Sequence, residues 1–311
     1  MQRARFTISP PDAAGSAARS AIAFHFAALE EQVPRAEAGE AEPIHQVRVS
    51  TRRLRAVIRL FAPYVAAIKP RQIDRQLKWI SNQAGKVREL DVIEALTRER
   101  ARELATGLAR SLEPLWEELP QERKQAIDEL AASLKSERYQ TMAVRLASPI
   151  PIAVQSDVPF ASAAAELAAP IVRSMMRQGE RLPDDPQAED LHRLRVRAKR
   201  CRYALETMTG LGDKRIEKVL TQLEEIQDVL GRYHDAVVAS SWIGAFVKER
   251  QLPAEVAFAC GALAESIHRS ERKLKRRGLQ LWRRFYLSDP DQTVLKALRD
   301  AQPVGASSDD A

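Results

Sequence analysis

Apolar residues recur at three- and four-residue intervals along most of the chain, which is the spacing of amphipathic α-helices. Strand signals are nearly absent, because no stretch shows sustained apolar-polar alternation or a hairpin turn between β-branched runs. The pattern predicts helices over 16–33, 43–66, 70–104, 121–146, 160–177, 188–208, 214–249 and 254–285. We therefore expect an all-α protein.

The chain divides into two halves at a proline-rich connector. Pro149, Pro151 and Pro159 interrupt helical hydrogen bonding over residues 149–159. Beyond Pro290 the helical spacing is lost and the chain ends in small and acidic residues, which predicts a mobile tail. The expected organisation is an N-terminal extension over 1–14, halves over 15–148 and 160–288 that form one domain, and a flexible tail over 289–311.

The halves carry related sequences. IHQVRVSTRRLRAVIRLF, which begins at Ile44, matches LHRLRVRAKRCRYALETM, which begins at Leu191. The identical pairs are His45/His192, Arg48/Arg195, Val49/Val196, Arg53/Arg200 and Arg55/Arg202, and a later echo relates Leu77, Ile80 and Gly85 to Leu223, Ile226 and Gly231. An internal duplication of a helical unit is the economical explanation.

Both matched helices carry a basic face. On the first helix it holds His45, Arg48, Arg52, Arg55 and Arg59 within an arc of roughly 80°, opposite Val47, Leu54, Val57, Ile58 and Phe61. On the second helix it holds His192, Arg195, Lys199 and Arg202, opposite Leu194, Cys201, Leu205 and Met208. Like charges at this spacing repel by about 0.2–0.5 kcal/mol per pair, and a bound polyanion would relieve the repulsion. Arginine suits phosphate because its rigid fork can meet two oxygens at once.

Interpretations without a bound ligand stay open for these residues. The basic faces could be solvated, or paired with acids such as Glu224, Glu225 and Asp228, and the histidines could be caps or satisfied core residues. A metal site is not favoured, because neither histidine has a Cys, His or carboxylate three or four residues after it. A further basic row of Arg269, Arg272 and Arg276 has Glu265 and Glu271 nearby, which favours an ion-paired surface.

Composition narrows the class of protein. Hydrophobic residues make up 45% and charged residues 29%, as in globular proteins, and the net charge of +7 favours an anionic partner. Two cysteines fit a reducing compartment, and no signal sequence or membrane-length apolar run is evident, so we expect a cytoplasmic protein without a membrane partner. Motifs for nucleotide binding, nucleophilic catalysis or metal hydrolysis are missing, which predicts a non-catalytic protein with no cofactor.

The pattern His-x-x-Arg-Val-x-x-Arg-Arg-Leu-Arg, from His45 to Arg55 and repeated from His192 to Arg202, resembles the conserved-histidine α-helical domain family, abbreviated CHAD. The segments after Gly85 and Gly231 are similar to a second motif of that family, with Ala84 and Glu89 as departures there and Cys201 as a departure in the repeated motif. The resemblance covers roughly residues 15–288.

The resemblance implies two four-helix subdomains around a basic central groove or pore, binding of inorganic polyphosphate, and association with polyphosphate granules in bacteria. The phosphate-facing positions it implies are His45, Arg48, Arg52, Arg53, Arg55, His192, Arg195, Lys199, Arg200 and Arg202, to which the helical face adds Arg59 and the second motif adds Arg88. Nucleic-acid binding is the alternative function, and a phosphohydrolase or phosphohistidine protein is a less favoured one.

Overall fold

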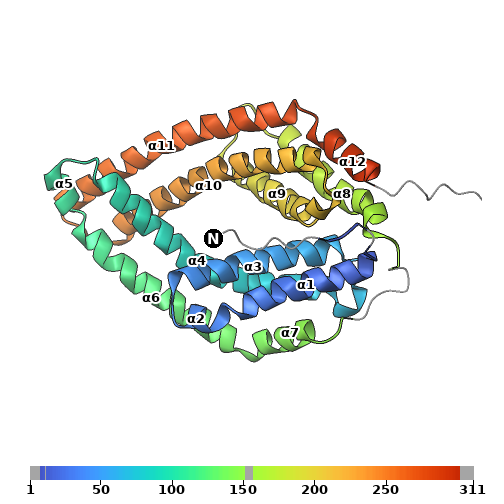
Figure 1. The fold of residues 1–311 in the computed structure, drawn as a ribbon. Helices are drawn as coiled ribbons and strands as arrows, with labels where there is room; N and C mark the ends of the chain where they lie inside the picture. The colour runs from blue at the N-terminus through green and yellow to red at the C-terminus, as the bar shows by residue number, and fades with distance from the viewer. Residues whose placement is uncertain (1–7, 11, 151–156, 302–311) are drawn as a thin grey trace, which may run out of the picture.

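The computed structural model describes residues 8–10, 12–150 and 157–301, and within these ranges the chain is helical with no β-strand (Figure 1). The first half contains α1 (Ala14–Glu30), α2 (Val33–Glu37), α3 (Ala41–Leu60), α4 (Pro70–Ala101), α5 (Thr106–Arg110), α6 (Glu113–Lys135) and α7 (Glu137–Ala147). The second half contains α8 (Phe160–Glu180), α9 (Ala188–Glu206), α10 (Lys214–Glu249), α11 (Ala254–Tyr286) and α12 (Pro290–Asp300). The all-α prediction is confirmed.

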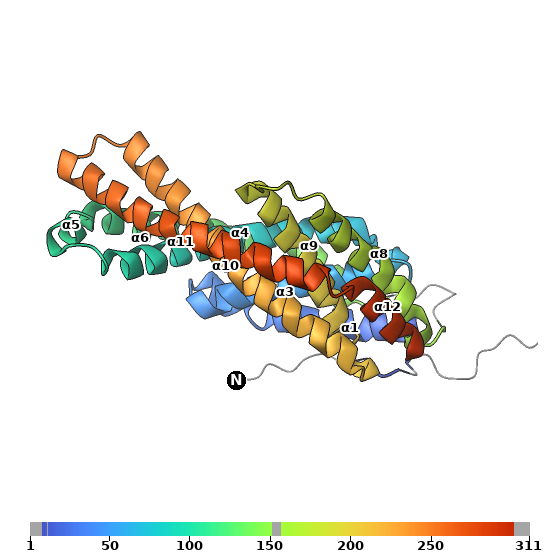
Figure 2. The same cartoon turned by 90° about the horizontal axis from the view of Figure 1, so that it is seen from above.

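The two halves lie against each other along their long helices. In each half the basic helix is followed by a longer helix on which it packs, so that α3 lies on α4 and α9 lies on α10. Contacts between α4 and α10 and between α3 and α9 join the halves. Figure 1 shows α1, α3 and α7 of the first half below α9 and α10 of the second half, and Figures 1 and 2 show α11 running along the outside of the second half. The two basic helices therefore come together in the interior of the molecule.

The apolar stripes of the basic helices are buried as predicted. Leu54 and Phe61 of the first stripe and Leu194 and Leu205 of the second have no exposed surface, and they belong to one hydrophobic core. A second core, which includes Leu112, Ile243 and Leu263, fills the other end of the molecule. Burial of these stripes fixes which faces of α3 and α9 remain available to a ligand.

The mobile tail predicted over 289–311 is wrong for its first part. Residues Pro290–Asp300 form α12, whose Val294 and Leu298 are buried in the main core, and Asp300 forms an ion pair with Arg215 at 2.8 Å. The stretch was too short to show a clear helical period from sequence, but its apolar residues still supply a face that packs on α8 and α10. Residues 302–311 lie outside the described part of the chain.

Two other predicted boundaries need correction. The helix expected over 121–146 is two helices, because Ser136 ends α6 and caps α7 by accepting a hydrogen bond from the Tyr139 backbone N–H. Helix α6 begins at Glu113 and passes through Pro120, since the neighbouring Leu119 is buried and holds the segment in the helix. In the predicted N-terminal extension, Ile8 is buried in the main core, while residues 1–7 lie outside the described part.

No helix in the described ranges combines the length and the apolar character that a bilayer span requires.

Candidate functional site

A cavity of about 390 Å³ opens between α3, α4 and α9, and we call it the basic cavity. Its charged and polar lining consists of Arg48, Arg52, Arg55, Arg59, Ser81, Asn82, Lys86, Glu89, His192, Arg195, Lys199, Arg200, Tyr203 and His234. Cations from both halves thus converge on one space, in which Glu89 is the single lining carboxylate among the described residues.

The structure brings most of the predicted residues together. Those that line the basic cavity are Arg48, Arg52, Arg55, Arg59, His192, Arg195, Lys199 and Arg200. Sequence reasoning missed Lys86 and His234, which α4 and α10 supply from the second motif of each half. The second motif was the signal that could have found them, because Lys86 and His234 follow Gly85 and Gly231 closely.

Other predicted residues do not line this cavity. Arg53 lies 3.7 Å from Glu206, and Arg202 lies 3.2 Å from Glu206 and 3.6 Å from Glu224. The ion-paired interpretation therefore holds for these two arginines, and Glu224 was one of the acids considered for it. His45 lies on the same helix as Arg48 but is not part of the cavity lining.

The arginines nearest the end of α3 are also partly neutralised. Arg55 and Arg59 donate to the two carboxylate oxygens of Asp74 on α4, at 3.0 and 2.7 Å. Although burial opposes ionisation of Asp74, these hydrogen bonds hold the pKa of its carboxyl below the usual value. The positive charge that Asp74 does not offset therefore lies nearer the start of α3 and on α9, around Arg48, Arg52 and Arg195.

A glycine on the long helix of each half lies next to the matched arginine of that half, Arg48 or Arg195. A Cβ at Gly85 would stand 2.4 Å from a terminal nitrogen of Arg48, whereas a Cβ at Gly231 would stand 3.9 Å from the guanidinium of Arg195. Arg48 thus occupies space that any side chain at position 85 would need. Arg195, in contrast, lies at an ordinary van der Waals distance from a Cβ at position 231. The glycine of the second motif lets the arginine of the first motif lie across the long helix.

Burial and mutual repulsion perturb the cations. Burial lowers the pKa of Arg48 to about 10, and repulsion from Arg52 and Arg195 adds to the effect while Glu89 and Asp235 oppose it. Lys199 is affected most: burial, followed by repulsion from Arg195, Arg52 and Arg48, lowers its pKa to about 6. Without a ligand, Lys199 is therefore mostly neutral at pH 7 while the arginines keep their charge.

The histidines of the cavity are neutral neighbours of these cations. The His192 and His234 rings lie 4.7 Å apart between centroids. Burial, with repulsion from Arg195, lowers the pKa of His234 to about 3 and also lowers that of His192. Neither ring carries a charge at pH 7, so each can take part in hydrogen bonding but not in ion pairing.

Two buried polar atoms in the cavity wall lack a partner in the described part of the chain. They are Nε of Arg195 and Nδ1 of His192. Leaving a buried donor unsatisfied costs about 1–3 kcal/mol, so such atoms call for an explanation. An acceptor oxygen of a ligand in the basic cavity would satisfy the Arg195 donor.

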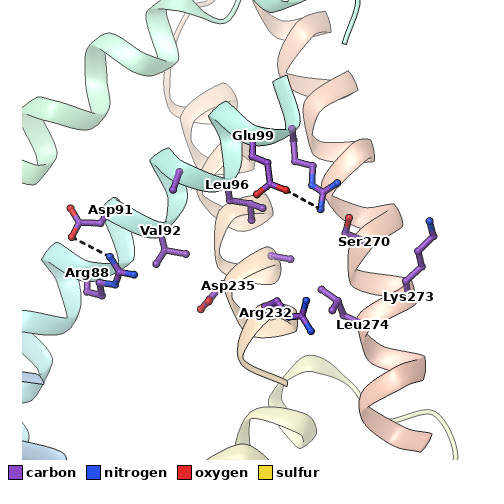
Figure 3. A pocket seen from close by; sticks show the side chains of 13 residues that line it. Arg88, Asp91, Val92, Leu96, Glu99, Arg232, Asp235, Ser270, Lys273 and Leu274 are labelled. Atoms are coloured by element: carbon purple, nitrogen blue, oxygen red, sulfur yellow. Dashed lines mark ion pairs between the residues drawn. The ribbon is translucent and has the colours of Figure 1, made fainter. Parts of the chain in front are cut away.

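Arg88, the remaining predicted residue, lines a different cavity. This mixed-charge cavity has a volume of about 640 Å³ and lies between α4, α10 and α11 (Figure 3). Arg88 points toward Asp91 at 3.7 Å, and Asp91 also accepts a hydrogen bond from Arg123 at 2.7 Å. Acids and bases alternate around this space, so it lacks the single sign of charge that marks the basic cavity.

Comparisons with known proteins identify the family and the fold of this chain. The family model described as the CHAD domain matches residues 20–244. Among solved structures, PptA from Streptomyces chartreusis is 19% identical with a TM-score of 0.71, and the match covers 88% of this chain and 100% of that one. The CHAD domain from the plant Ricinus communis is 23% identical with a TM-score of 0.70, covering 90% and 96%. No curated protein matches the chain by sequence.

The depressed pKa of Lys199 gives a prediction about stability. Because its pKa falls from 10.5 to about 6 on folding, the unfolded chain binds more protons between these values, and stability should rise with pH across this window. We expect Lys199→Met to raise the unfolding free energy at pH 7 by about 1–2 kcal/mol and to flatten its dependence on pH. Urea unfolding at several pH values measures both.

Lys86→Met is the matched control, since Lys86 also lines the cavity but is 55% exposed and paired with Glu129. If Lys199→Met is no more stable than this control at pH 7, burial and charge repulsion do not penalise the Lys199 ammonium as the lowered pKa implies.

Proposed function

This chain belongs to the CHAD domain family, and on that premise we propose that it binds inorganic polyphosphate in the basic cavity without converting it chemically. The observation that carries the proposal is the convergence of half-buried arginines from α3 and α9 on one space. We also propose that the protein associates with polyphosphate granules, since a molecule that holds the polymer would collect where the polymer does.

Charge supports an anionic ligand. Arg48, Arg195 and Lys199 are half-buried beside one another, and the pKa of each is lowered chiefly by burial. A phosphate group among them would replace lost hydration and remove their repulsion. Binding would also return a proton to Lys199, because an adjacent anion raises the pKa of an ammonium group.

The shape of the site supports a linear polymer. A volume of about 390 Å³ is at the lower end of the usual range for ligand pockets and accommodates only a short run of phosphate groups. From Arg48 to Arg59 the row on α3 extends roughly 16 Å, and α9 supplies a second row beside it. A longer chain would leave the cavity and remain available to other surfaces or molecules.

Nucleic acid fits the site less well. Single-stranded nucleic acid is usually held by base stacking on exposed aromatic rings together with backbone contacts. Among the described residues that line the cavity, Tyr203 is the only Phe, Tyr or Trp, and it is 8% exposed. A cavity that offers cations without a stacking surface favours a polyanion that has no bases.

Substitution of one arginine from each half tests the proposal. We expect the double variant Arg48→Gln with Arg195→Gln to bind long-chain polyphosphate at least tenfold more weakly than the wild type. The slope of log affinity against log salt should become shallower by about two, because two phosphate contacts are lost. Calorimetric titrations at several salt concentrations provide both numbers, and the chain length of the recovered polymer shows whether it was cleaved.

Arg193→Gln is the control, since Arg193 lies on α9 but pairs with Glu189 and Asp190 outside the cavity. A folded double variant that binds as tightly as this control would place the polymer elsewhere, and shortened polymer would show that the protein is an enzyme.

The two glycines provide a finer test of the same geometry. Gly85→Ala should displace the Arg48 guanidinium, because the added Cβ would stand 2.4 Å from it, and should weaken polyphosphate binding by about three- to tenfold. Gly231→Ala should bind nearly as the wild type does, since Arg195 leaves ordinary contact distance there. Equal affinities for the two alanine variants would mean that Arg48 does not contact the polymer from this position.

A further inference from the structure

The solvent-facing side of α11 carries a row of cations that the basic cavity does not use. Its members are Arg269, Arg272, Lys273, Arg276, Arg283 and Arg284, all exposed. At 100° per residue they fall within an arc of about 120°, opposite the buried Leu281, Trp282 and Phe285. The row extends roughly 22 Å along the helix. We call these six residues the α11 row.

Acids neutralise only one end of the α11 row. Glu265 lies 4.0 Å from Arg269 and 3.2 Å from Arg272. Glu271, the other acid expected to pair here, instead accepts from Ser240 at 2.7 Å and lies 3.1 Å from His268. The ion-paired interpretation of the row therefore applies to its first turn alone. Within the described ranges, no ion pair involves Lys273, Arg276, Arg283 or Arg284.

Two cations beside the row already form ion pairs with carboxylates. Lys275 pairs with Asp185 at 2.5 Å, and Arg277 pairs with Glu225 at 2.9 Å. The side chains of these acids are 81% and 47% exposed. The row is thus a narrow positive line with carboxylates close to its edges.

The α11 row and the basic cavity are separate surfaces. Residues of α3, α4, α9 and α10 line the basic cavity, and no described residue of α11 does so. Helix α11 runs along the outside of the second half, on the side away from α3 (Figures 1 and 2). A polymer held in the cavity would leave the row open.

We propose that the α11 row is a second polyphosphate-binding surface, so that one molecule holds two polymer segments and cross-links chains. The inference rests on the proposed function. A linear polymer fits a line of charge about 22 Å long, whereas a flat anionic membrane would also meet the exposed Asp185 and Glu225. Single-stranded nucleic acid would find no stacking surface within the row, because Trp282 and Phe285 face the core and the exposed Phe258 lies roughly 16 Å before Arg269 along the helix.

The basic cavity and the α11 row should differ in their affinity for polyphosphate. Exposed charges contribute about 0.2–1 kcal/mol each and are screened by salt, so the row should hold short chains weakly. Long chains engage several cations at once and can reach a second molecule, which raises the effective concentration of the next contact. Cross-linking therefore requires long polymer, whereas occupation of the cavity does not.

The test uses the variant R276Q/R283Q/R284Q and a control, R102Q/R110Q/K124Q, which removes the same charge from exposed positions outside both cavities. Light scattering follows network formation with long-chain polyphosphate, and calorimetry measures short-chain affinity. We expect the α11 variant to scatter at least fivefold less than the wild type and the control, while its short-chain affinity stays within twofold of theirs.

Scattering by the α11 variant equal to that of the control would overturn the second surface while leaving the cavity proposal intact. Absence of short-chain binding in the wild type would instead overturn the proposed function. Loss of binding to acidic phospholipid vesicles, with scattering by polyphosphate unchanged, would identify the row as a membrane contact and also overturn the inference.

Discussion

Repulsion among half-buried cations is the constraint around which the centre of this molecule is organised. Arg48, Arg52, Arg195 and Lys199 come from two helices, and burial together with repulsion from neighbouring cations lowers the pKa values of Arg48, Arg195 and Lys199. They stay together because each helix buries an opposite apolar stripe, and burial of one large apolar side chain contributes about 1.5–3 kcal/mol. The hydrophobic core thus holds a charge arrangement that would be unfavourable without a ligand.

Smaller features adapt the fold to that arrangement. Gly85 leaves room for the Arg48 guanidinium to lie across α4, and Asp74 removes charge near Arg55 and Arg59. Lys199 is mostly neutral at pH 7, because burial and repulsion from neighbouring arginines lower its pKa to about 6. Each feature lowers the electrostatic cost of the buried cations, while Glu89 stays the single carboxylate among the described residues that line the cavity. Charge arrangements that cost stability are common at functional sites.

Helical periodicity predicted most of the fold, but side-chain partners could not be read from it. Long amphipathic repeats indicated the class and the main helices, whereas α12 was missed because it is short and begins with a proline, which was interpreted as the end of helical spacing. Arg202 shares a helical face with Arg195, yet Glu206 and Glu224 pair with it. Arg200 lies outside the basic face of its helix but still lines the cavity. The way in which the helices cross, and not the spacing along one helix, decides which side chains meet.

We propose that the two basic helices act as one site. The most direct measurement is a crystal structure of the protein with a polyphosphate of defined short length. Phosphate groups should lie in the basic cavity, with at least one within hydrogen-bonding distance of Arg195 Nε and another near Arg48. Polymer bound only on outer surfaces, with the cavity holding solvent, would show that the two basic helices do not form the binding site.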